Sequence, residues 1–233
     1  MRAMTDQPDK SAGRRRPVRS FVLRTGRITA GQRRAMQDLW PQYGLSMPEE
    51  ALDFTAVYGR PSQPTLEIGF GNGESLLAMA AAAPEQDFLG IEVHEPGVGH
   101  CLLGVEKAEL GNVRVMRDDA VEVLQRCIAD HSLGRVNLFF PDPWHKKRHH
   151  KRRIVQPDFV ALIARKLVPG GIFHVATDWP NYAEHIQEVM AAATDFVALQ
   201  NFPDDRIETR FDQRGQRLGH ENFEGAWRTR SNQ

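Results

Sequence analysis

Short apolar runs alternate with longer segments of helical periodicity through the middle of this chain. Short apolar runs between turn signals are typical of buried strands, and apolar positions spaced by three and four residues are typical of helices. The runs predict strands at residues 66–68, 88–93, 113–116, 136–140 and 172–176, with weaker patterns at 196–199 and 223–228. The helical segments lie at residues 30–39, 74–83, 96–110, 120–130, 157–167 and 182–193.

The alternation of strands and helices from residue 65 to residue 193 predicts βαβ units and therefore an α/β fold with a mostly parallel sheet. Right-handed crossovers place the carboxyl ends of parallel strands at one edge of the sheet. Ligands of such sheets bind outside that edge. The residues just past each strand are therefore the candidates for function.

An acidic residue stands at or just beyond the end of each of the five main strands. These residues are Glu67, Glu92, Asp119, Asp142 and Asp178. Such regularity indicates a ligand site lined by carboxylates rather than a set of unrelated surface charges.

A glycine-rich turn follows the first of these strands, with Gly69, Gly71 and Gly73 at alternate positions. The next residue is Glu74, so the G-x-G-x-x-G dinucleotide fingerprint is not met. Two carboxylates, Glu67 before the turn and Glu74 after it, are unfavourable near a pyrophosphate. They favour a ligand that carries positive charge.

The next two strand ends indicate a nucleoside. Glu92 follows the second strand, where a carboxylate can accept both hydroxyls of a ribose. Asp119 or its neighbour Asp118 could accept a hydrogen bond from an adenine amino group, although either could instead cap the following helix. A ribose, an adenine, a cationic group and no phosphate describe S-adenosylmethionine. This organisation resembles the class I S-adenosylmethionine-dependent methyltransferases, which implies a Rossmann-like three-layer sandwich with a seven-stranded sheet and helices on both faces.

Charge is distributed unevenly although the net charge is zero. Residues 1–34 carry ten Lys or Arg against two Asp, and residues 145–153 carry six with no acid. This asymmetry favours a polyanionic partner. We expect residues 1–20 to be a disordered basic tail and residues 21–233 to form a single domain. No apolar run is long enough to span a membrane, and the polar, basic start is not expected to be a secretory signal. With only two cysteines, we expect a cytoplasmic location.

Three motifs in the second half carry a more specific resemblance. They are Pro-Asp-Pro-Trp-His-Lys-Lys-Arg-His at 141–149, Ala-Thr-Asp-Trp at 176–179, and Thr-Arg-Phe-Asp-Gln-Arg-Gly at 209–215. With the glycine-rich turn, they resemble the bacterial tRNA (guanine-N7-)-methyltransferase family from about residue 20 to the C-terminus. Asp212 stands where the family pattern has Glu, and residues 222–227 are less typical of it.

The resemblance implies transfer of a methyl group from S-adenosylmethionine to a guanine N7 in the variable loop of tRNA, at position 46. It implies a catalytic Asp142 that also contacts the cofactor. Further implied cofactor contacts are Glu67, Gly69, Gly71, Gly73, Glu92 and Asp119. Implied substrate contacts are Lys146, Asp178, Thr209, Arg210, Phe211 and Asp212, and implied RNA contacts are Arg148, His149, His150, Lys151, Arg152 and Arg153.

The chemistry at N7 limits what Asp142 has to do. Guanine N7 has an in-plane lone pair and is unprotonated at neutral pH, so no general base is required. We expect Asp142 to orient the guanine through its N1–H and exocyclic amine, and to stabilise the cationic product. The base is expected to leave its stack, with Trp144, Trp179 and Phe211 as candidate platforms or as simple packing residues.

Two other functions fit these residues less well. A class I methyltransferase acting on a small molecule or a protein would not need the basic run at 146–153. A non-catalytic RNA-binding protein on a methyltransferase scaffold would not need the complete set of strand-end residues. His145, His149 and His150 lack the cysteines or adjacent acid of a metal site, so no metal is expected. No obligate protein partner is expected, and the sequence leaves open a monomer or a homodimer.

Overall fold

The computed structural model describes residues 20–21, 26–201, 206 and 222–230. The predicted tail is outside this set except for Ser20, and the substrate segment at 209–212 is outside it entirely.

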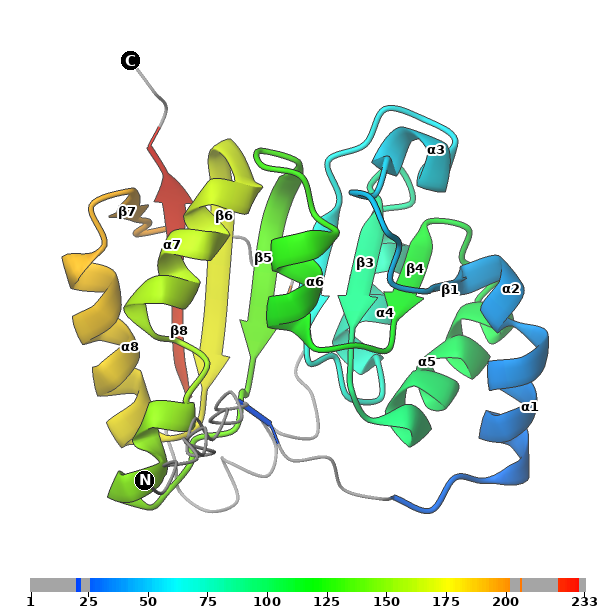
Figure 1. The fold of residues 1–233 in the computed structure, drawn as a ribbon, viewed down its shortest axis with the longest axis horizontal. Helices are drawn as coiled ribbons and strands as arrows, with labels where there is room; N and C mark the ends of the chain where they lie inside the picture. The colour runs from blue at the N-terminus through cyan, green and yellow to red at the C-terminus, as the bar shows by residue number, and fades with distance from the viewer. Residues whose placement is uncertain (1–19, 22–25, 202–205, 207–221, 231–233) are drawn as a thin grey trace, which may run out of the picture.

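One mixed sheet forms the centre of the molecule (Figure 1). Its strand order is β1-β4-β3-β2-β5-β6-β8-β7. All neighbouring strands from β1 to β6 are parallel, and β8 is antiparallel to both β6 and β7. The bounds are β1 Gly44–Leu45, β2 Thr65–Ile68, β3 Phe88–Ile91, β4 Val113–Met116, β5 Leu133–Phe139, β6 Leu167–Thr177, β7 Phe196–Ala198 and β8 Phe223–Thr229.

Helices cover both faces of this sheet (Figure 1). On one face α6, α7 and α8 share a core with the apolar side of β2, β5 and β6, and on the other α1, α4 and α5 pack against β3 and β4. The bounds are α1 Ala30–Asp38, α2 Trp40–Tyr43, α3 Phe54–Tyr58, α4 Glu74–Ala82, α5 Glu95–Lys107, α6 Ala120–Arg126, α7 Pro157–Lys166 and α8 Pro180–Ala192. The result is the predicted three-layer α/β sandwich.

Local sequence explains where several of these helices begin. Thr29 and Gln32 form a reciprocal capping box at the start of α1. Pro157 and Pro180 occupy the first positions of α7 and α8, where the missing N–H has no intrahelical partner in any case. Asp119 caps α6 by accepting a hydrogen bond from the Val121 backbone at 3.0 Å.

The chain order places a topological switch point between β2 and β5. From β2 the sheet grows through β3 and β4 toward one edge, and from β5 through β6 toward the other. The loops that follow β2 and β5 therefore diverge and leave a crevice at the carboxyl edge of the sheet. These are the glycine-rich turn and the segment that contains Asp142.

The seven predicted strands are all present, and the structure adds details that the apolar pattern did not predict. The eighth strand, β1, is a two-residue pairing with β4, too short to give a periodic signal. Strand β6 begins at Leu167, not at 172, because Leu167 pairs with Leu133 before the chain bulges through Pro169 and Gly170. The strands and helices predicted from the sequence leave the basic segment unassigned, and in the structure residues Lys147–Arg152 form a 3₁₀ helix, labelled η1.

Candidate active site

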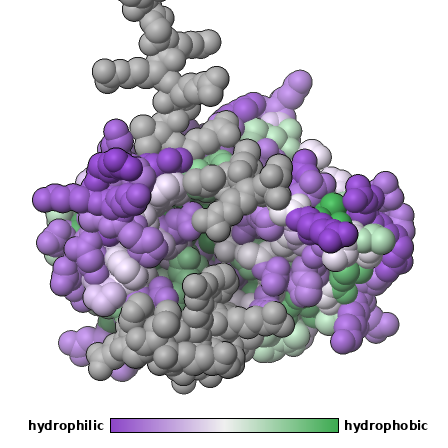
Figure 2. Space-filling view, turned by 90° about the horizontal axis from the view of Figure 1, so that it is seen from below, coloured by the Kyte–Doolittle hydropathy of each residue, from purple (hydrophilic) through white to green (hydrophobic). Residues whose placement is uncertain are grey.

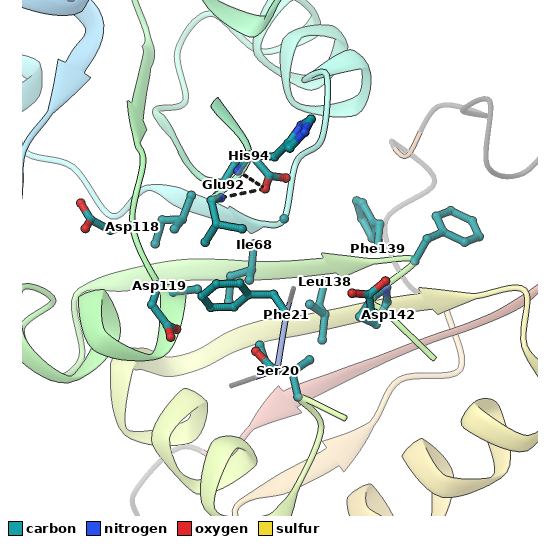
Figure 3. Close-up of a pocket in the computed structure, with 17 residues that line it drawn as sticks. Ser20, Phe21, Ile68, Glu92, His94, Asp118, Asp119, Leu138, Phe139 and Asp142 are labelled. Atoms are coloured by element: carbon teal, nitrogen blue, oxygen red, sulfur yellow. Dashed lines mark hydrogen bonds between the residues drawn. The ribbon is translucent and has the colours of Figure 1, made fainter. Parts of the chain in front are cut away.

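A cavity of about 430 Å³ opens at the switch point. Its floor is apolar, formed by Ile68, Ile91, Leu138 and Ile154. Its carboxylates come from the ends of β3, β4 and β5 and are Glu92, Asp118, Asp119 and Asp142. Figure 3 shows these carboxylates around the apolar floor, and Figure 2 shows the surrounding face as largely hydrophilic with hydrophobic surface near its middle. Three of the five predicted strand ends thus meet at one site, through Glu92, through Asp119 with its neighbour Asp118, and through Asp142.

Glycine is required in the glycine-rich turn for its backbone conformation and, at one position, for close packing. Gly69, Gly71 and Gly73 all have positive φ, at 73°, 57° and 84°. Among the described residues, no heavy atom beyond the adjoining residues lies within 4 Å of a Cβ built on Gly69 or Gly71, so the backbone there borders open space. A Cβ on Gly73 would instead meet the Cys101 sulfur at 2.6 Å, which identifies Gly73 as a packing residue between α4 and α5. Of the three, only Gly69 lines the cavity.

Glu92 is buried at the end of β3 and is held by three backbone N–H groups. Its Oε2 accepts from Gly71 at 2.9 Å, and its Oε1 accepts from Val93 at 2.7 Å and from His94 at 2.9 Å. The carboxylate is therefore fixed in the cavity wall (Figure 3). Each oxygen has more than one lone pair, so these bonds leave the group able to accept from a ligand hydroxyl.

Asp118 and Asp119 both line the cavity but differ in their local role. Asp119 is the N-cap of α6, which fixes the direction of its carboxylate. Asp118 is half-buried, and its pKa is raised by burial and then by the nearby charge of Glu122. A cap and a ligand contact are compatible for Asp119, because a carboxylate has acceptor capacity beyond one bond.

Asp142 sits in a turn that the backbone holds in an unusual conformation. Pro141 and Pro143 flank it, and beyond them Phe140 and Trp144 have positive φ of 49° and 50°. Bulky residues rarely occupy this region, and such conformations cluster where function requires them. The turn carries the exposed Asp142 side chain to the rim of the cavity (Figure 3).

Glu67 does not line the cavity, although the sequence placed it with the other strand-end acids. It precedes the last residue of β2, so its side chain faces the opposite side of the sheet from that of Ile68. It is 3% exposed, and burial raises its pKa to about 8, an effect opposed by the charge of Arg135. Its Oε2 has no hydrogen-bond partner in the described part of the chain.

The basic segment lies next to the cavity, where Arg152 stacks on Trp144. The guanidinium carbon is 4.0 Å from a ring centroid, and the indole N–H donates to the Ser20 carbonyl at 3.0 Å. One ring face is therefore already covered, so a base could stack there only if Arg152 moved. Trp179 makes an edge contact with the exposed His145, with centroids 4.3 Å apart.

Only some of the predicted substrate residues lie in the part of the chain that the structure describes. Lys146 is exposed and precedes η1, and Asp178 is half-buried just past β6, but neither lines the cavity. Thr209, Arg210, Phe211 and Asp212 lie outside the described residues. His149 and His150 lie in η1, half-buried, with pKa values lowered by burial and by the neighbouring Arg and Lys charges.

Sequence reasoning missed Ser20 and Phe21, which line the cavity from the N-terminal side. Figure 3 shows Phe21 between Asp119 and Leu138. The Phe21 carbonyl accepts a hydrogen bond from Arg152 at 3.3 Å. The change from a basic to an apolar composition at Phe21 was the available signal, but nothing in the pattern indicated a contact more than a hundred residues away.

The described residues do not supply a metal site or a membrane-spanning helix. They contain no group of three or more His, Cys, Asp or Glu side chains placed to hold a metal ion. None of their helices combines the length and the apolar composition needed to cross a membrane. Cys101 and Cys127 are both free and buried.

The features of the cavity fit S-adenosylmethionine. Open space borders Gly69 and Gly71, a fixed carboxylate stands at the end of β3, and the apolar floor suits a purine. Solved structures agree on the fold. A 16S rRNA methyltransferase, KamB, superposes with a TM-score of 0.55 at 16% identity, covering 78% of this chain and 95% of that one. An S-adenosylmethionine-dependent methyltransferase from Aquifex aeolicus gives 0.50 at 15% identity, covering 72% and 82%. The fold is that of the class I methyltransferases.

Sequence relatives are much closer. A family profile described as "Putative methyltransferase" matches residues 62–225. A tRNA (guanine-N(7)-)-methyltransferase of Alcanivorax borkumensis is 57% identical over 218 residues, covering 91% of this chain and 90% of that protein. Proteins of the same name from Shewanella amazonensis and Ectopseudomonas mendocina are 57% and 54% identical, and the latter alignment covers 96% of this chain and 95% of that protein. The chain belongs to the tRNA (guanine-N(7)-)-methyltransferase family.

Proposed function

We propose that this chain transfers a methyl group from S-adenosylmethionine to N7 of the guanine at position 46 in the variable loop of tRNA. The activity and the cofactor follow from family membership, and the position in tRNA is the finer part of the proposal. The observation that carries it is the placement of Asp142. It stands at the rim of a cavity suited to the cofactor, four residues before Lys146, the first of the cations that lead into η1.

The cavity residues would hold the cofactor in three parts. The backbone at Gly69 and Gly71 would approach the amino-acid portion, because no side chain intervenes there. Glu92 would accept from the ribose hydroxyls, and Asp119 from the adenine amino group above the apolar floor. When bound, S-adenosylmethionine supplies an electrophilic methyl group on a positively charged sulfur.

The reaction exchanges one bond for another without moving a proton. The bond between sulfur and the methyl carbon breaks, while the lone pair of guanine N7 forms the new carbon–nitrogen bond. Positive charge moves from sulfur to the purine. Since no proton leaves N7, the protein has to orient the base and stabilise its charge, and orientation alone can contribute about 7–11 kcal/mol.

Asp142 suits that orienting role. A carboxylate at the rim can accept hydrogen bonds from both N1–H and the exocyclic amine of guanine, and no other base offers two donors on that edge in the same way. Its negative charge would also stabilise the cationic methylated base. The two prolines limit the freedom of the turn, so the carboxylate is held before the substrate arrives.

The exposed cations near the cavity would hold the tRNA backbone. Lys146, Lys147, Arg148 and Lys151 are all exposed, and phosphate contacts of this kind fix register without reading sequence. The guanine would leave its stack to reach the cavity. A small-molecule substrate does not account for these cations, and a non-catalytic role is not favoured by relatives that are named as methyltransferases. We also propose a cytoplasmic enzyme that works without an obligate partner, as a monomer or a homodimer.

The direct test is methyl transfer from radiolabelled S-adenosylmethionine to unmodified tRNA, followed by nucleoside digestion and borohydride–aniline cleavage. We expect the label in 7-methylguanosine and a single cleavage site in the variable loop. A tRNA in which guanine 46 is replaced by adenine is the matched control and should accept no label. Label at another guanine would overturn the position, and no transfer to tRNA would overturn the substrate.

A further inference from the structure

The last cation of the basic run differs from the others in its environment. Arg153 is 2% exposed, whereas Lys147, Arg148 and Lys151 are exposed to solvent. A buried guanidinium is not available to a phosphate on the surface. The residues that share a charge in the sequence therefore do not share a role.

The three nitrogens of Arg153 bridge two segments beside the cavity. Nε donates to the Pro143 carbonyl at 3.0 Å, Nη1 to the Asn181 carbonyl at 3.2 Å, and Nη2 to the Asn181 side-chain oxygen at 2.8 Å. Pro143 directly follows Asp142, and Asn181 lies in the first turn of α8, three residues after Asp178. One planar guanidinium thus fixes the distance between the Asp142 turn and the start of α8.

The rest of the Arg153 environment is unusual for a cation. Its guanidinium lies over the fully buried Tyr182 ring, 4.7 Å from the centroid, and Nη2 is 3.2 Å from His150 Nε2. Arginine has no acceptor, so His150 must accept at Nε2 and carry its proton on Nδ1. No Asp or Glu of the described residues forms an ion pair with Arg153. Burial of a cation without a carboxylate is unfavourable, and burial lowers the pKa of Arg153.

The conformation of the Asp142 turn requires such support. Phe140 and Trp144, on either side of the two prolines, both have positive φ. Backbone in this region persists only where its surroundings over-determine it. The bond from Arg153 to the Pro143 carbonyl falls within this turn, one residue from Asp142.

We propose that Arg153 is a positioning residue for methyl transfer and not an RNA contact: its guanidinium ties the Pro143 carbonyl to Asn181 and so fixes Asp142 at the rim of the cavity. The proposal deepens the proposed function and rests on it, since Asp142 is the group being positioned. An outward swing of Arg153 toward RNA would break three hydrogen bonds and the contact with Tyr182, and would leave the Pro143 turn without this support.

The test compares Arg153→Lys with Arg148→Gln and with Arg228→Gln, an exposed residue on β8. Lysine keeps the charge but has a single nitrogen, which cannot bridge Pro143 and Asn181 in this geometry. We expect Arg153→Lys to lower kcat about 100-fold or more, with the tRNA Kd, its salt dependence and the S-adenosylmethionine Kd changed less than twofold. Arg148→Gln should weaken tRNA binding and reduce the salt slope by about 0.7–0.9. Arg228→Gln should match the wild type.

A second readout does not depend on activity. Amide hydrogen exchange over residues 140–144 and 178–181 should be faster in Arg153→Lys than in the wild type or Arg228→Gln. If Arg153 variants do not fold, Asn181→Ala tests whether the bridge from Arg153 to α8 positions Asp142. It removes one acceptor of the bridge and should lower kcat with both ligands still bound, whereas Asn181→Asp, which keeps that acceptor, should retain activity.

Four outcomes would overturn the proposal. They are a kcat near wild type in Arg153→Lys, unchanged exchange at residues 140–144, a kcat near wild type in Asn181→Ala, and a loss of tRNA affinity and salt slope in Arg153→Lys equal to that in Arg148→Gln. If the wild type transfers no methyl group to tRNA, the proposed function fails by itself, and the exchange experiment then decides whether Arg153 holds the turn.

Discussion

The side chain of Glu92 accepts a hydrogen bond from the backbone N–H of Gly71 at 2.9 Å, which joins the end of β3 to the glycine-rich turn after β2. The second carboxylate oxygen is held by Val93 and His94. One residue therefore fixes both the shape of the turn and the acceptor expected to meet the ribose. Its loss should affect the cofactor far more than the tRNA.

We predict that Glu92→Gln weakens S-adenosylmethionine binding about 10- to 100-fold, the range for loss of charge-assisted hydrogen bonds worth about 1.5–3 kcal/mol. An amide cannot accept at every position where the carboxylate does, so an N–H would face either Gly71 or the two following N–H groups. Titration calorimetry gives the Kd. Glu95→Gln is the control, since Glu95 is exposed and outside the cavity. Cofactor affinity equal to wild type would exclude the proposed role.

Asp119→Asn separates the capping role of Asp119 from its proposed contact with adenine. Asparagine is as good an N-cap as aspartate, so the stability of α6 should change by less than about 0.5 kcal/mol. If its oxygen caps the helix, its amine faces the cavity, where a donor would oppose the adenine amino group. We predict a roughly tenfold weaker cofactor affinity with an unchanged Tm. Asp118→Asn is the matched variant, and a larger loss there would assign adenine to Asp118 instead.

The sequence predicted the sheet and the cavity wall well because both depend on short-range pattern. Each main strand is an apolar run next to a turn signal, and parallel strands must end at one edge, so Glu92 and Asp142 could be placed together without coordinates. Glu67 differs from the other strand-end acids because it precedes Ile68, and adjacent side chains of a strand face opposite sides. Its contact with the cofactor stays a prediction.

Other features depended on contacts that no local pattern encodes. Arg153 has the same charge as Arg148, and only the packing of Tyr182 and Asn181 around it reveals that it is buried. Phe21 lines the cavity although it comes from a segment without hydrophobic periodicity. A hydrogen bond from Arg152 to the Phe21 carbonyl joins that segment to the basic run. Composition gives the charge of a segment but not which of its members face solvent.

Asp142→Asn tests the chemistry at the rim. Asparagine has the size of aspartate, but it offers one acceptor and one donor where guanine presents two donors, and it carries no charge to stabilise the product. We predict a loss in kcat of about 100-fold or more with tRNA affinity within twofold of wild type. Single-turnover transfer at saturating cofactor and tRNA separates the chemical step from binding. Near-normal turnover would show that another group orients the base.

The exposed cations of η1 should determine how tRNA binding depends on salt. Replacing Lys147, Arg148 and Lys151 together with alanine should reduce the slope of log affinity against log salt by about 2 to 3, because each phosphate contact contributes about 0.7–0.9. Filter binding between about 50 and 200 mM salt measures the slope. The control replaces Lys107 and Arg228, which are exposed at the ends of α5 and β8. A slope that the triple variant leaves unchanged would place the tRNA on another face.

Glu224 on β8 should give the protein a measurable acid dependence. Its carboxylate is hydrogen-bonded to His174 Nε2 at 2.7 Å and accepts from Arg206 at 3.0 Å. Burial alone would raise the pKa of Glu224, but these two partners outweigh it and lower the pKa to about 2. Arg135 donates to the other ring nitrogen of His174, which leaves Nε2 as the nitrogen that faces Glu224.

The pKa of Glu224 is lower in the folded protein than in the unfolded chain, so its ionised carboxylate stabilises the fold. This stabilisation is complete above about pH 4.5 and is lost as the pH falls to about 2. The shift corresponds to roughly 3 kcal/mol at most. We predict that Glu224→Gln is less stable than wild type at pH 7 and that the difference narrows steadily between pH 4.5 and 2. Urea unfolding at several pH values measures both curves, with the exposed Glu95→Gln as control. A difference that stays constant over this range would mean that Glu224 is not ionised against these partners.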